Sequence, residues 1–222
     1  MQITRGKMNS TSKIMHEQRE KMITNHLIAR GISDQRVIEA MRKTKRELFI
    51  PEQYMVDAYG DHPLPIGDGQ TISQPYIVAL MSQLCQLKGD EKVLEIGSGS
   101  GYQTAILSLL ASEIYSIERI KNLKETAEKN LIKFGCKNVK LIHGDGYKGL
   151  PEQAPFDVII LTAAPDTLPE VLISQLASKG RLVAPVGSSV QKLIRISKDG
   201  EKLHSEEIIH VRFVPMIKGY NK

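Results

Sequence analysis

The feature that most constrains the fold is a regular alternation of strand-like and helix-like segments after Gly89-Asp90. Short β-rich runs predict strands at 92–96, 113–117, 139–143, 158–162 and 181–184. Segments with helical spacing of apolar residues predict helices at 102–111, 121–134 and 168–176. Because strands joined through helices run parallel, we expect an α/β protein with a doubly wound, mainly parallel sheet. Two further runs, 192–197 and 208–214, flank Asp199-Gly200 and predict an antiparallel C-terminal edge.

The part of the chain before this alternation predicts N-terminal helices and one long loop. Apolar residues predict a helix from Met15 to Ala29, and Ser33 is placed to cap a second helix. Residues 59–74 are dense in Gly, Pro and Asp, and irregular loops of this length are often functional. Pro75 suits the first turn of the next helix. We expect a single domain, 1–222, with a mobile tail to about residue 14, helices and the loop to about 88, and an α/β core to about 219.

The composition is that of an ordinary globular protein and excludes several classes. Of 222 residues, 41% are apolar and 25% charged. Folding a chain of this size buries roughly 70% of its unfolded surface, which is enough for one substantial core. The sequence contains neither a run of 18 apolar residues nor an apolar leader, so we expect no membrane span and no secretion. Cys85 and Cys136 lie far apart, which favours a reduced, cytoplasmic protein.

The charge pattern gives little reason to expect a nucleic-acid partner. The net charge is +5, and the basic run at 42–46, R-K-T-K-R, predicts a solvated helix face rather than a phosphate-binding patch. No aromatic residues interleave with this run. The six histidines show no metal-ligand spacing, so we expect no metal site. We expect the chain to act as a monomer, without nucleic acid or membrane.

The strongest chemical signal is a glycine-rich turn between a predicted strand and a predicted helix. It reads Glu95-Ile96-Gly97-Ser98-Gly99-Ser100-Gly101. Its spacing is G-x-G-x-G, which differs from the dinucleotide fingerprint G-x-G-x-x-G. The Glu95 carboxylate would repel a pyrophosphate but would attract an amino group or a sulfonium. The alternative interpretation is a purely structural tight turn.

Two carboxylates follow at the ends of the next two predicted strands. Glu118 can accept hydrogen bonds from both hydroxyls of a ribose, and Asp145 can accept one from an adenine amino group. Taken singly, Glu118 could be a surface residue paired with Arg119 or Lys121, and Asp145 an ordinary turn residue. Open α/β sheets bind ligands at the carboxyl ends of their strands, so the three features together predict a nucleoside site.

These motifs resemble those of class I S-adenosylmethionine-dependent methyltransferases. More narrowly, the chain resembles the protein-L-isoaspartate O-methyltransferase family, especially its bacterial members, from about Met15 to Gly219. The matching blocks are P-L-P-I-G-D-G-Q-T-I-S-Q-P (63–75), V-L-E-I-G-S-G-S-G-Y-Q-T-A (93–105), S-I-E-R-I (116–120), H-G-D-G (143–146), A-P-F-D (154–157), T-A-A-P (162–165) and V-R-F-V-P (211–215). Many methyltransferases share the glycine loop, whereas the first and last blocks are far more specific to this family.

The resemblance implies a Rossmann-like methyltransferase fold and a protein repair reaction. A methyl group would pass from S-adenosylmethionine to the α-carboxylate of an L-isoaspartyl residue in a damaged protein, leaving S-adenosylhomocysteine. The ester would close to a succinimide, whose hydrolysis partly restores aspartate. Ser73 matches the family's active-site serine. The cofactor contacts implied are Glu95, Gly97, Ser98, Gly99, Gly101, Glu118, Asp145 and Gly146.

The chemistry of that reaction suits these residues. A carboxylate is already an anion at pH 7, so no strong general base is needed, and Ser73 is interpreted as a positioning residue. The alternative for Ser73 is a plain N-cap of the helix that begins near Pro75. On the substrate side we expect Ile66 and Ile72 to exclude water. We expect Ala163 and Ala164 to leave room for a peptide, and Arg212 and Val214 to flank it. As alternatives, Arg212 could be a surface residue, and the two alanines could serve strand–helix packing.

Other functions stay open at this point. A methyltransferase of the same fold could act on RNA or on a small molecule, for which the only support is the basic pI of about 9.1. A non-catalytic binding module could keep the same cavity. A nicotinamide dehydrogenase is disfavoured by the glycine spacing and by Glu95.

Overall fold

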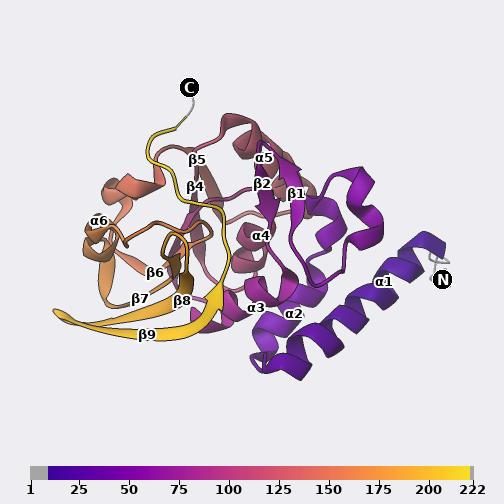
Figure 1. Ribbon diagram of the computed structural model, residues 1–222, viewed down its shortest axis with the longest axis horizontal. Helices are drawn as coiled ribbons and strands as arrows, with labels where there is room; N and C mark the ends of the chain where they lie inside the picture. Colours follow the sequence, from indigo (N-terminus) through magenta and orange to yellow (C-terminus); the bar gives the residue numbers. More distant parts are fainter. Residues whose placement is uncertain (1–9, 221–222) are drawn as a thin grey trace, which may run out of the picture.

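A seven-stranded sheet forms the centre of the protein. The structure is a computed structural model that describes residues 10–220. The strand order is β5-β4-β3-β6-β7-β8-β9 (Figure 1). The strands are β3 (Lys92–Ile96), β4 (Glu113–Glu118), β5 (Val139–His143), β6 (Phe156–Leu161), β7 (Leu176–Val186), β8 (Gln191–Asp199) and β9 (Lys202–Val211). The five strands β5, β4, β3, β6 and β7 pair in parallel in this order, whereas β8 pairs antiparallel with both β7 and β9. The predicted doubly wound sheet with an antiparallel C-terminal edge is therefore confirmed.

Apolar side chains are buried on both faces of this sheet. Along β3, Val93 belongs to one hydrophobic cluster and Leu94 to another, because successive residues of a strand point to opposite faces. The first cluster includes apolar residues of the N-terminal helices and of the helix at 102–108, and the second includes Leu172 of the helix at 170–174. The helices are α1 (Ser10–Met22), α2 (Gln35–Lys43), α3 (Pro75–Leu84), α4 (Tyr102–Ser108), α5 (Lys121–Phe134) and α6 (Glu170–Ser174). None of the helices within residues 10–220 is both long and apolar enough to cross a bilayer.

The N-terminal helices differ in detail from the prediction. Helix α1 begins at Ser10 and continues as a π-helical turn, Ile23–Leu27, and a 3-10 turn, Ile28–Arg30. Residues 10–14, expected in a tail, are therefore helical, and the rest of that tail lies outside the described residues. The cap of α2 is Asp34 and not Ser33, because the Asp34 carboxylate accepts the N–H groups of Arg36 and Val37.

The basic run at 42–46 is only partly the solvated face that we expected. Lys43 and Lys45 are exposed, but Thr44 and Arg46 are completely buried. The expectation is wrong for Arg46 because α2 ends at Lys43. Thr44 is extended, with φ −85° and ψ 102°, and the chain then turns inward into a 3-10 turn, Arg46–Phe49.

The expected irregular loop at 59–74 contains a regular hairpin. Strands β1 (Leu64–Gly67) and β2 (Gln70–Ile72) pair antiparallel around Asp68-Gly69. Gly67, Asp68 and Gly69 have φ of 97°, 50° and 69°, which is the left-handed backbone that tight hairpin turns require. The density of Gly and Asp therefore marks a β-turn, and the prediction of an irregular stretch is wrong there. Helix α3 begins at Pro75, as expected.

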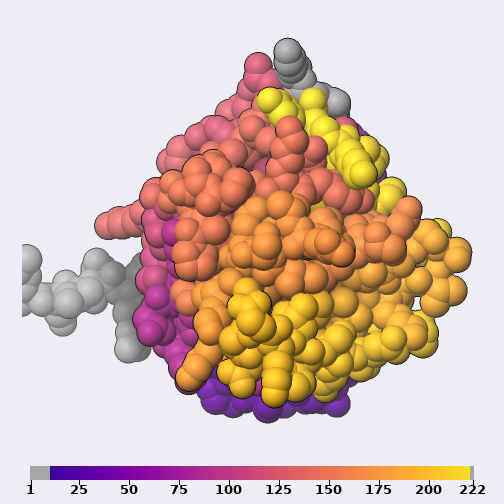
Figure 2. All heavy atoms as spheres, turned by 90° about the vertical axis from the view of Figure 1, so that its left-hand side faces the viewer, coloured from indigo at the N-terminus to yellow at the C-terminus, as the bar shows by residue number. Residues whose placement is uncertain are grey.

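The C-terminal half carries longer strands than predicted. Strand β7 runs through Gly180, where a helix end was expected, and α6 is correspondingly short. Strand β9 ends at Val211, so residues 212–214 leave the sheet. Figure 2 shows that these late segments, orange to yellow, make up most of one face of the molecule.

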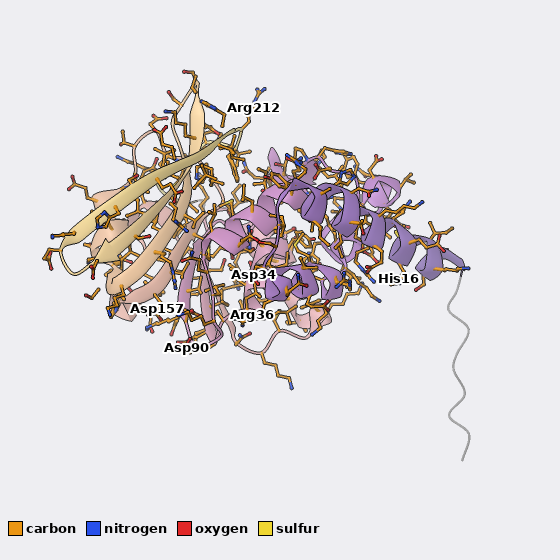
Figure 3. The ribbon with its side chains drawn as sticks, turned by 90° about the horizontal axis from the view of Figure 1, so that it is seen from below. His16, Asp34, Arg36, Asp90, Asp157 and Arg212 are labelled. Carbon is orange, nitrogen blue, oxygen red and sulfur yellow. The ribbon has the colours of Figure 1, made fainter. Side chains whose placement is uncertain are left out.

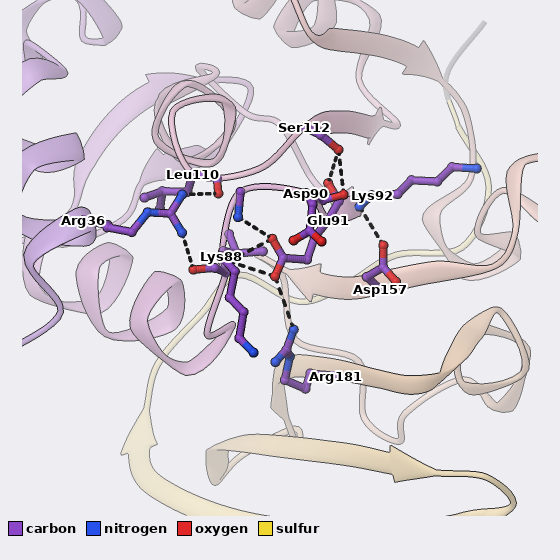
Figure 4. A network of polar contacts seen from close by, with 11 residues as sticks. Arg36, Lys88, Asp90, Glu91, Lys92, Leu110, Ser112, Asp157 and Arg181 are labelled. Atoms are coloured by element: carbon purple, nitrogen blue, oxygen red, sulfur yellow. Dashed lines mark hydrogen bonds and ion pairs between the residues drawn. The ribbon is translucent and has the colours of Figure 1, made fainter.

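Polar contacts tie together the amino ends of the parallel strands (Figure 4). The Glu91 carboxylate accepts the N–H groups of Lys88 and Gly89, and Asp157 accepts the N–H of Lys92 at 2.9 Å. Arg36 donates to the carbonyl oxygens of Leu87 and Leu110. These contacts satisfy several backbone groups at the amino end of the sheet, whereas open α/β sheets bind ligands at the opposite, carboxyl end.

Candidate active site

The glycine turn after β3 shapes a cavity at the carboxyl end of the sheet. Gly97, Gly99 and Gly101 have φ of 97°, 52° and 87°, which side chains rarely adopt. A Cβ on Gly97 would lie 2.4 Å from Thr162 Oγ1, so no side chain fits there. Gly97, Ser98 and Gly99 line the cavity. Gly101 does not line the cavity. It caps α4 against Leu131 of α5, so its requirement for glycine comes from its left-handed backbone and from helix packing.

Glu118 faces this cavity from the end of β4. Its Oε2 accepts the N–H of Gly99 and its Oε1 accepts the N–H of Ile120, both at 2.9 Å. The residue is 5% exposed and forms no ion pair within residues 10–220. The alternative of a surface carboxylate paired with Arg119 or Lys121 is therefore wrong. Glu118 lines the cavity, and each of its oxygens has capacity for a further hydrogen bond, as two ribose hydroxyls require.

The end of β5 contributes a glycine to the cavity and a carboxylate beside it. Gly146 lines the cavity, and a Cβ there would lie 2.3 Å from Ile96 Cγ2. Asp145 is not a lining residue. Its Oδ1 accepts the N–H of Tyr147 at 3.0 Å, which caps a short 3-10 turn and leaves Oδ2 without a partner in the described part of the chain. Asp145 therefore has a turn role, and one of its oxygens stays available.

Glu95 lies behind the glycine turn rather than in the cavity. It is 0% exposed, and its Oε2 accepts the hydroxyls of Thr104 and Ser116, each at 2.5 Å. Burial is the main reason why its pKa is raised to about 7, and the hydrogen bonds from Ser116 and Thr104 oppose that rise. Its Oε1 has no hydrogen-bond partner among residues 10–220.

Two residues that line the cavity, Ser98 and Tyr102, carry buried hydroxyls. Ser98 Oγ and Tyr102 OH are buried without a hydrogen-bond partner in the described chain, and both residues line the cavity. Buried polar atoms without a partner are rare in folded proteins. The glycine cradle and the Glu118 carboxylate beside them fit a ligand that carries a ribose.

Ser73 stands where this cavity meets a second opening. It lines both the cavity and a groove of about 750 Å³, which runs between the β2–α3 junction and the segment after β9. The N-cap of α3 is Gln74, whose side chain makes no capping hydrogen bond within residues 10–220. The plain N-cap role for Ser73 is therefore wrong, and its hydroxyl makes no hydrogen bond within residues 10–220.

The expected substrate residues lie around this junction. Ile72, Ala163 and Val214 line the cavity, and Ile66 Cδ1 would contact a Cβ on Gly99 at 3.3 Å, so Ile66 covers the glycine turn. Ala164 is buried beneath them, and its backbone pairs with the chain on both sides of Pro215.

Arg212 lies apart from the cavity but lines the groove. It is exposed, and its guanidinium forms no hydrogen bond or ion pair with residues 10–220. In Figure 3 it stands at the opposite end of the sheet from Arg36, Asp90 and Asp157. Arg30 and His210 also line the groove, and Arg30 forms an ion pair with Asp61.

Several residues that line the cavity were not predicted as site residues, although Thr162 lies in the T-A-A-P block. Thr162 Oγ1 donates to the carbonyl of Gly97 at 2.6 Å and so fixes the glycine turn. Met216 and Ile217 come from the C-terminal segment, which crosses back over the sheet after β9 (Figure 1). Hydrogen bonds from Tyr147 OH to Met216 O and from Arg119 Nε to Gly219 O hold that segment in place.

Comparisons with known proteins converge on one family. A family model described as protein-L-isoaspartate(D-aspartate) O-methyltransferase matches residues 17–221. Protein-L-isoaspartate O-methyltransferase 1 of Syntrophobacter fumaroxidans is 50% identical over 200 residues, covering 90% of this chain and 94% of the relative. The enzyme of that name from Vibrio campbellii is 49% identical over 193 residues, covering 87% and 93%.

Solved structures agree with these matches. A structure from Plasmodium falciparum, described as a protein-L-isoaspartate O-methyltransferase in complex with S-adenosyl-L-homocysteine, has a TM-score of 0.80 at 27% identity and covers 90% of this chain and 99% of its own. Another protein-L-isoaspartate O-methyltransferase has a TM-score of 0.81 at 32% identity, and this chain covers 65% of its length.

Proposed function

The chain belongs to the protein-L-isoaspartate(D-aspartate) O-methyltransferase family, and on that premise we propose a role for each part of its site. Its activity is S-adenosylmethionine-dependent methylation of the α-carboxylate of L-isoaspartyl residues in damaged proteins. The ester then closes to a succinimide, which partly returns aspartate. The observation that carries the proposed roles is the Ser73 hydroxyl, which lies at the junction of the glycine-turn cavity and the open groove and has no partner in the described part of the chain.

The cavity is proposed to hold S-adenosylmethionine, which supplies a methyl group on a sulfonium. The free lone pairs of the Glu118 carboxylate accept the ribose hydroxyls. Asp145 and Gly146 receive the adenine end. Gly97, Ser98 and Gly99 approach the methionine part, and Ser98 Oγ then finds the partner that it lacks. Glu95 and Gly101 act from behind the turn, where they shape it.

The nucleophile in this reaction needs orientation more than activation. A substrate carboxyl with an ordinary pKa near 4 is an anion at pH 7. The Ser73 hydroxyl has no competing partner within residues 10–220, so it can donate to that carboxylate and align it. Orientation of two reactants contributes up to about 7–11 kcal/mol in favourable cases. Ile66 and Ile72 keep water away while the two charges neutralise each other.

The groove beside Ser73 is proposed to take the damaged protein segment. Its volume of about 750 Å³ lies in the range of ordinary ligand sites, and it opens on Ser73 and Thr162. The small side chain of Ala163 leaves space at the junction, and Ala164 supports it from beneath. Val214 contacts the segment, and Arg212 binds a carboxylate that flanks the isoaspartate.

We further propose that the chain works as one domain and as a monomer in the cytoplasm, on protein rather than on nucleic acid or membrane. A single hydrophobic cluster that includes Met22 of α1 and Val158 of β6 supports one folding unit. The two cysteines are free, and Cys85 is completely buried, which suits a reducing compartment.

A labelling experiment tests this function. The protein is incubated with methyl-labelled S-adenosylmethionine and a matched pair of peptides that differ only in Asp or isoaspartate. We expect base-labile label on the isoaspartyl peptide alone. Label that survives mild base would exclude a carboxyl ester. Preferential labelling of RNA in a competition would favour the alternative methyltransferase, and cofactor binding without any transfer would favour a binding module.

A further inference from the structure

Arg46 is a buried cation that reaches the backbone of the active-site serine. Its side chain is 0% exposed, although it belongs to a run of basic residues. Nη1 donates to the carbonyl of Ala58 at 2.8 Å, and Nη2 donates to the carbonyls of His62 and Ser73 at 3.2 and 3.0 Å. One guanidinium thus connects three backbone positions that lie up to 15 residues apart.

No carboxylate pairs with Arg46 in the described part of the chain. Desolvation lowers its pKa, and nearby Tyr102, Tyr59 and Asp61 oppose that effect. A buried charge without a counter-ion is unfavourable, because it loses its hydration. The three hydrogen bonds to backbone carbonyls compensate for part of that loss. Lysine could not make the same contacts, because the planar guanidinium fork holds several acceptors in fixed directions.

A second set of contacts fixes the chain on the other side of Ser73. Asp61 accepts hydrogen bonds from the Gln74 side chain at 2.7 Å and from the N–H of Tyr76 at 3.3 Å. Arg30 pairs with the same carboxylate at 2.7 Å. The turn between β2 and α3 is therefore held from both ends, by Asp61 after Ser73 and by Arg46 at Ser73 itself.

The orientation of the Ser73 hydroxyl depends on this backbone. Its oxygen makes no hydrogen bond within residues 10–220, so no neighbouring side chain sets its direction. The side chain that bonds directly to the backbone of residue 73 is that of Arg46. The Arg46 guanidinium also stands 5.9 Å from the ring of Tyr102, which lines the cofactor cavity.

We propose that Arg46 is a positioning residue for methyl transfer, which holds the Ser73 backbone so that the serine hydroxyl meets the substrate carboxylate. This proposal rests on the role given to Ser73 under the proposed function. It predicts that loss of Arg46 affects the rate through Ser73 and leaves cofactor affinity unchanged.

A double-mutant cycle tests the connection. Ser73→Ala, Arg46→Met and the combined variant are assayed with an isoaspartyl peptide, and rates are expressed per site that binds S-adenosylhomocysteine, so unfolded protein does not count. We expect each single change to lower kcat/KM by about tenfold or more, because misplacement by about 1 Å can reduce rates by about 100-fold. In the Ser73→Ala background, Arg46→Met should add less than about a twofold loss. The affinity for S-adenosylhomocysteine should stay within about twofold of the parent.

A matched control comes from the other end of the sheet. Arg36 also donates to two backbone carbonyls, those of Leu87 and Leu110, at 2.6 and 2.9 Å (Figure 4). Arg36→Met removes similar contacts far from Ser73. It should lower the Tm yet leave kcat/KM per folded site unchanged in either background. If Arg46→Met yields no folded protein, Arg46→Lys replaces it, with a smaller loss that again disappears beside Ser73→Ala.

The outcomes separate the two proposals. Losses that multiply in the combined variant would overturn the role of Arg46 and leave that of Ser73 intact. A fully active Ser73→Ala enzyme would overturn both positioning roles. A parent protein that methylates no isoaspartyl peptide would overturn the proposed function itself.

Discussion

Glu118 offers the sharpest quantitative test of the cofactor site. Its two carboxylate oxygens each accept one backbone N–H and keep one lone pair for a ribose hydroxyl. In Glu118→Gln one of these acceptors becomes an amide donor. A hydrogen bond to a charged group contributes about 1.5–3 kcal/mol, so the loss of one such bond costs about 2 kcal/mol. That corresponds to an increase of about thirtyfold in the Kd for S-adenosylhomocysteine.

The assay is calorimetric titration of each variant with S-adenosylhomocysteine. Glu128→Gln is the matched control, because Glu128 is a half-exposed carboxylate on α5 that pairs with Lys124. It removes the same charge from a surface site, and the Kd should stay within about twofold. A 2′-deoxy analogue should lose affinity for the parent protein but lose less for Glu118→Gln. If Glu118→Gln binds S-adenosylhomocysteine as tightly as the parent, the assignment of Glu118 to the ribose is refuted.

Two further predictions concern Glu95 and Arg212. The pKa of Glu95 is raised from 4.5 to about 7, so between these pH values the folded chain keeps a proton that the unfolded chain has lost. The free energy of unfolding therefore falls as pH rises through this window, by up to about 3 kcal/mol. In urea unfolding at pH 5 and pH 8, Glu95→Gln should lack this decline, and equal pH slopes for the two proteins would contradict the shift. Arg212→Gln should raise KM by up to about fivefold for peptides with Glu beside the isoaspartate, because an exposed ion pair contributes about 0.2–1 kcal/mol. The same change should leave the KM for neutral peptides unaffected. An equal effect on both kinds of peptide would contradict the proposed ion pair.

The sheet could be predicted well because its pattern is local. Strand β3, helix α5 and strand β5 have the bounds read from apolar runs and from Gly135. The hairpin β1–β2 was missed because Pro and Gly obscure a short strand, although the D-G pair marks its turn. The predicted strand at 181–184 is shorter than β7, because a glycine such as Gly180 signals a break without indicating whether neighbouring strands continue the pairing.

The site could be predicted as a set of residues but not as a geometry. The sequence indicates that Gly97, Glu118 and Ser73 belong to one site, and the structure brings all three to one cavity. It could not show that Glu95 lies behind that cavity, since both faces of a buried strand are apolar. Arg46 was missed for a related reason, because a basic run reports charge and not where the chain turns inward.

The most direct test is a crystal structure of the protein with S-adenosylhomocysteine and an isoaspartyl peptide. We expect the ribose on Glu118, the peptide in the groove beside Arg212, and the Ser73 hydroxyl within about 3.2 Å of the isoaspartyl α-carboxylate. A complex in which the cavity is empty, or in which Ser73 faces away from that carboxylate, would contradict the account.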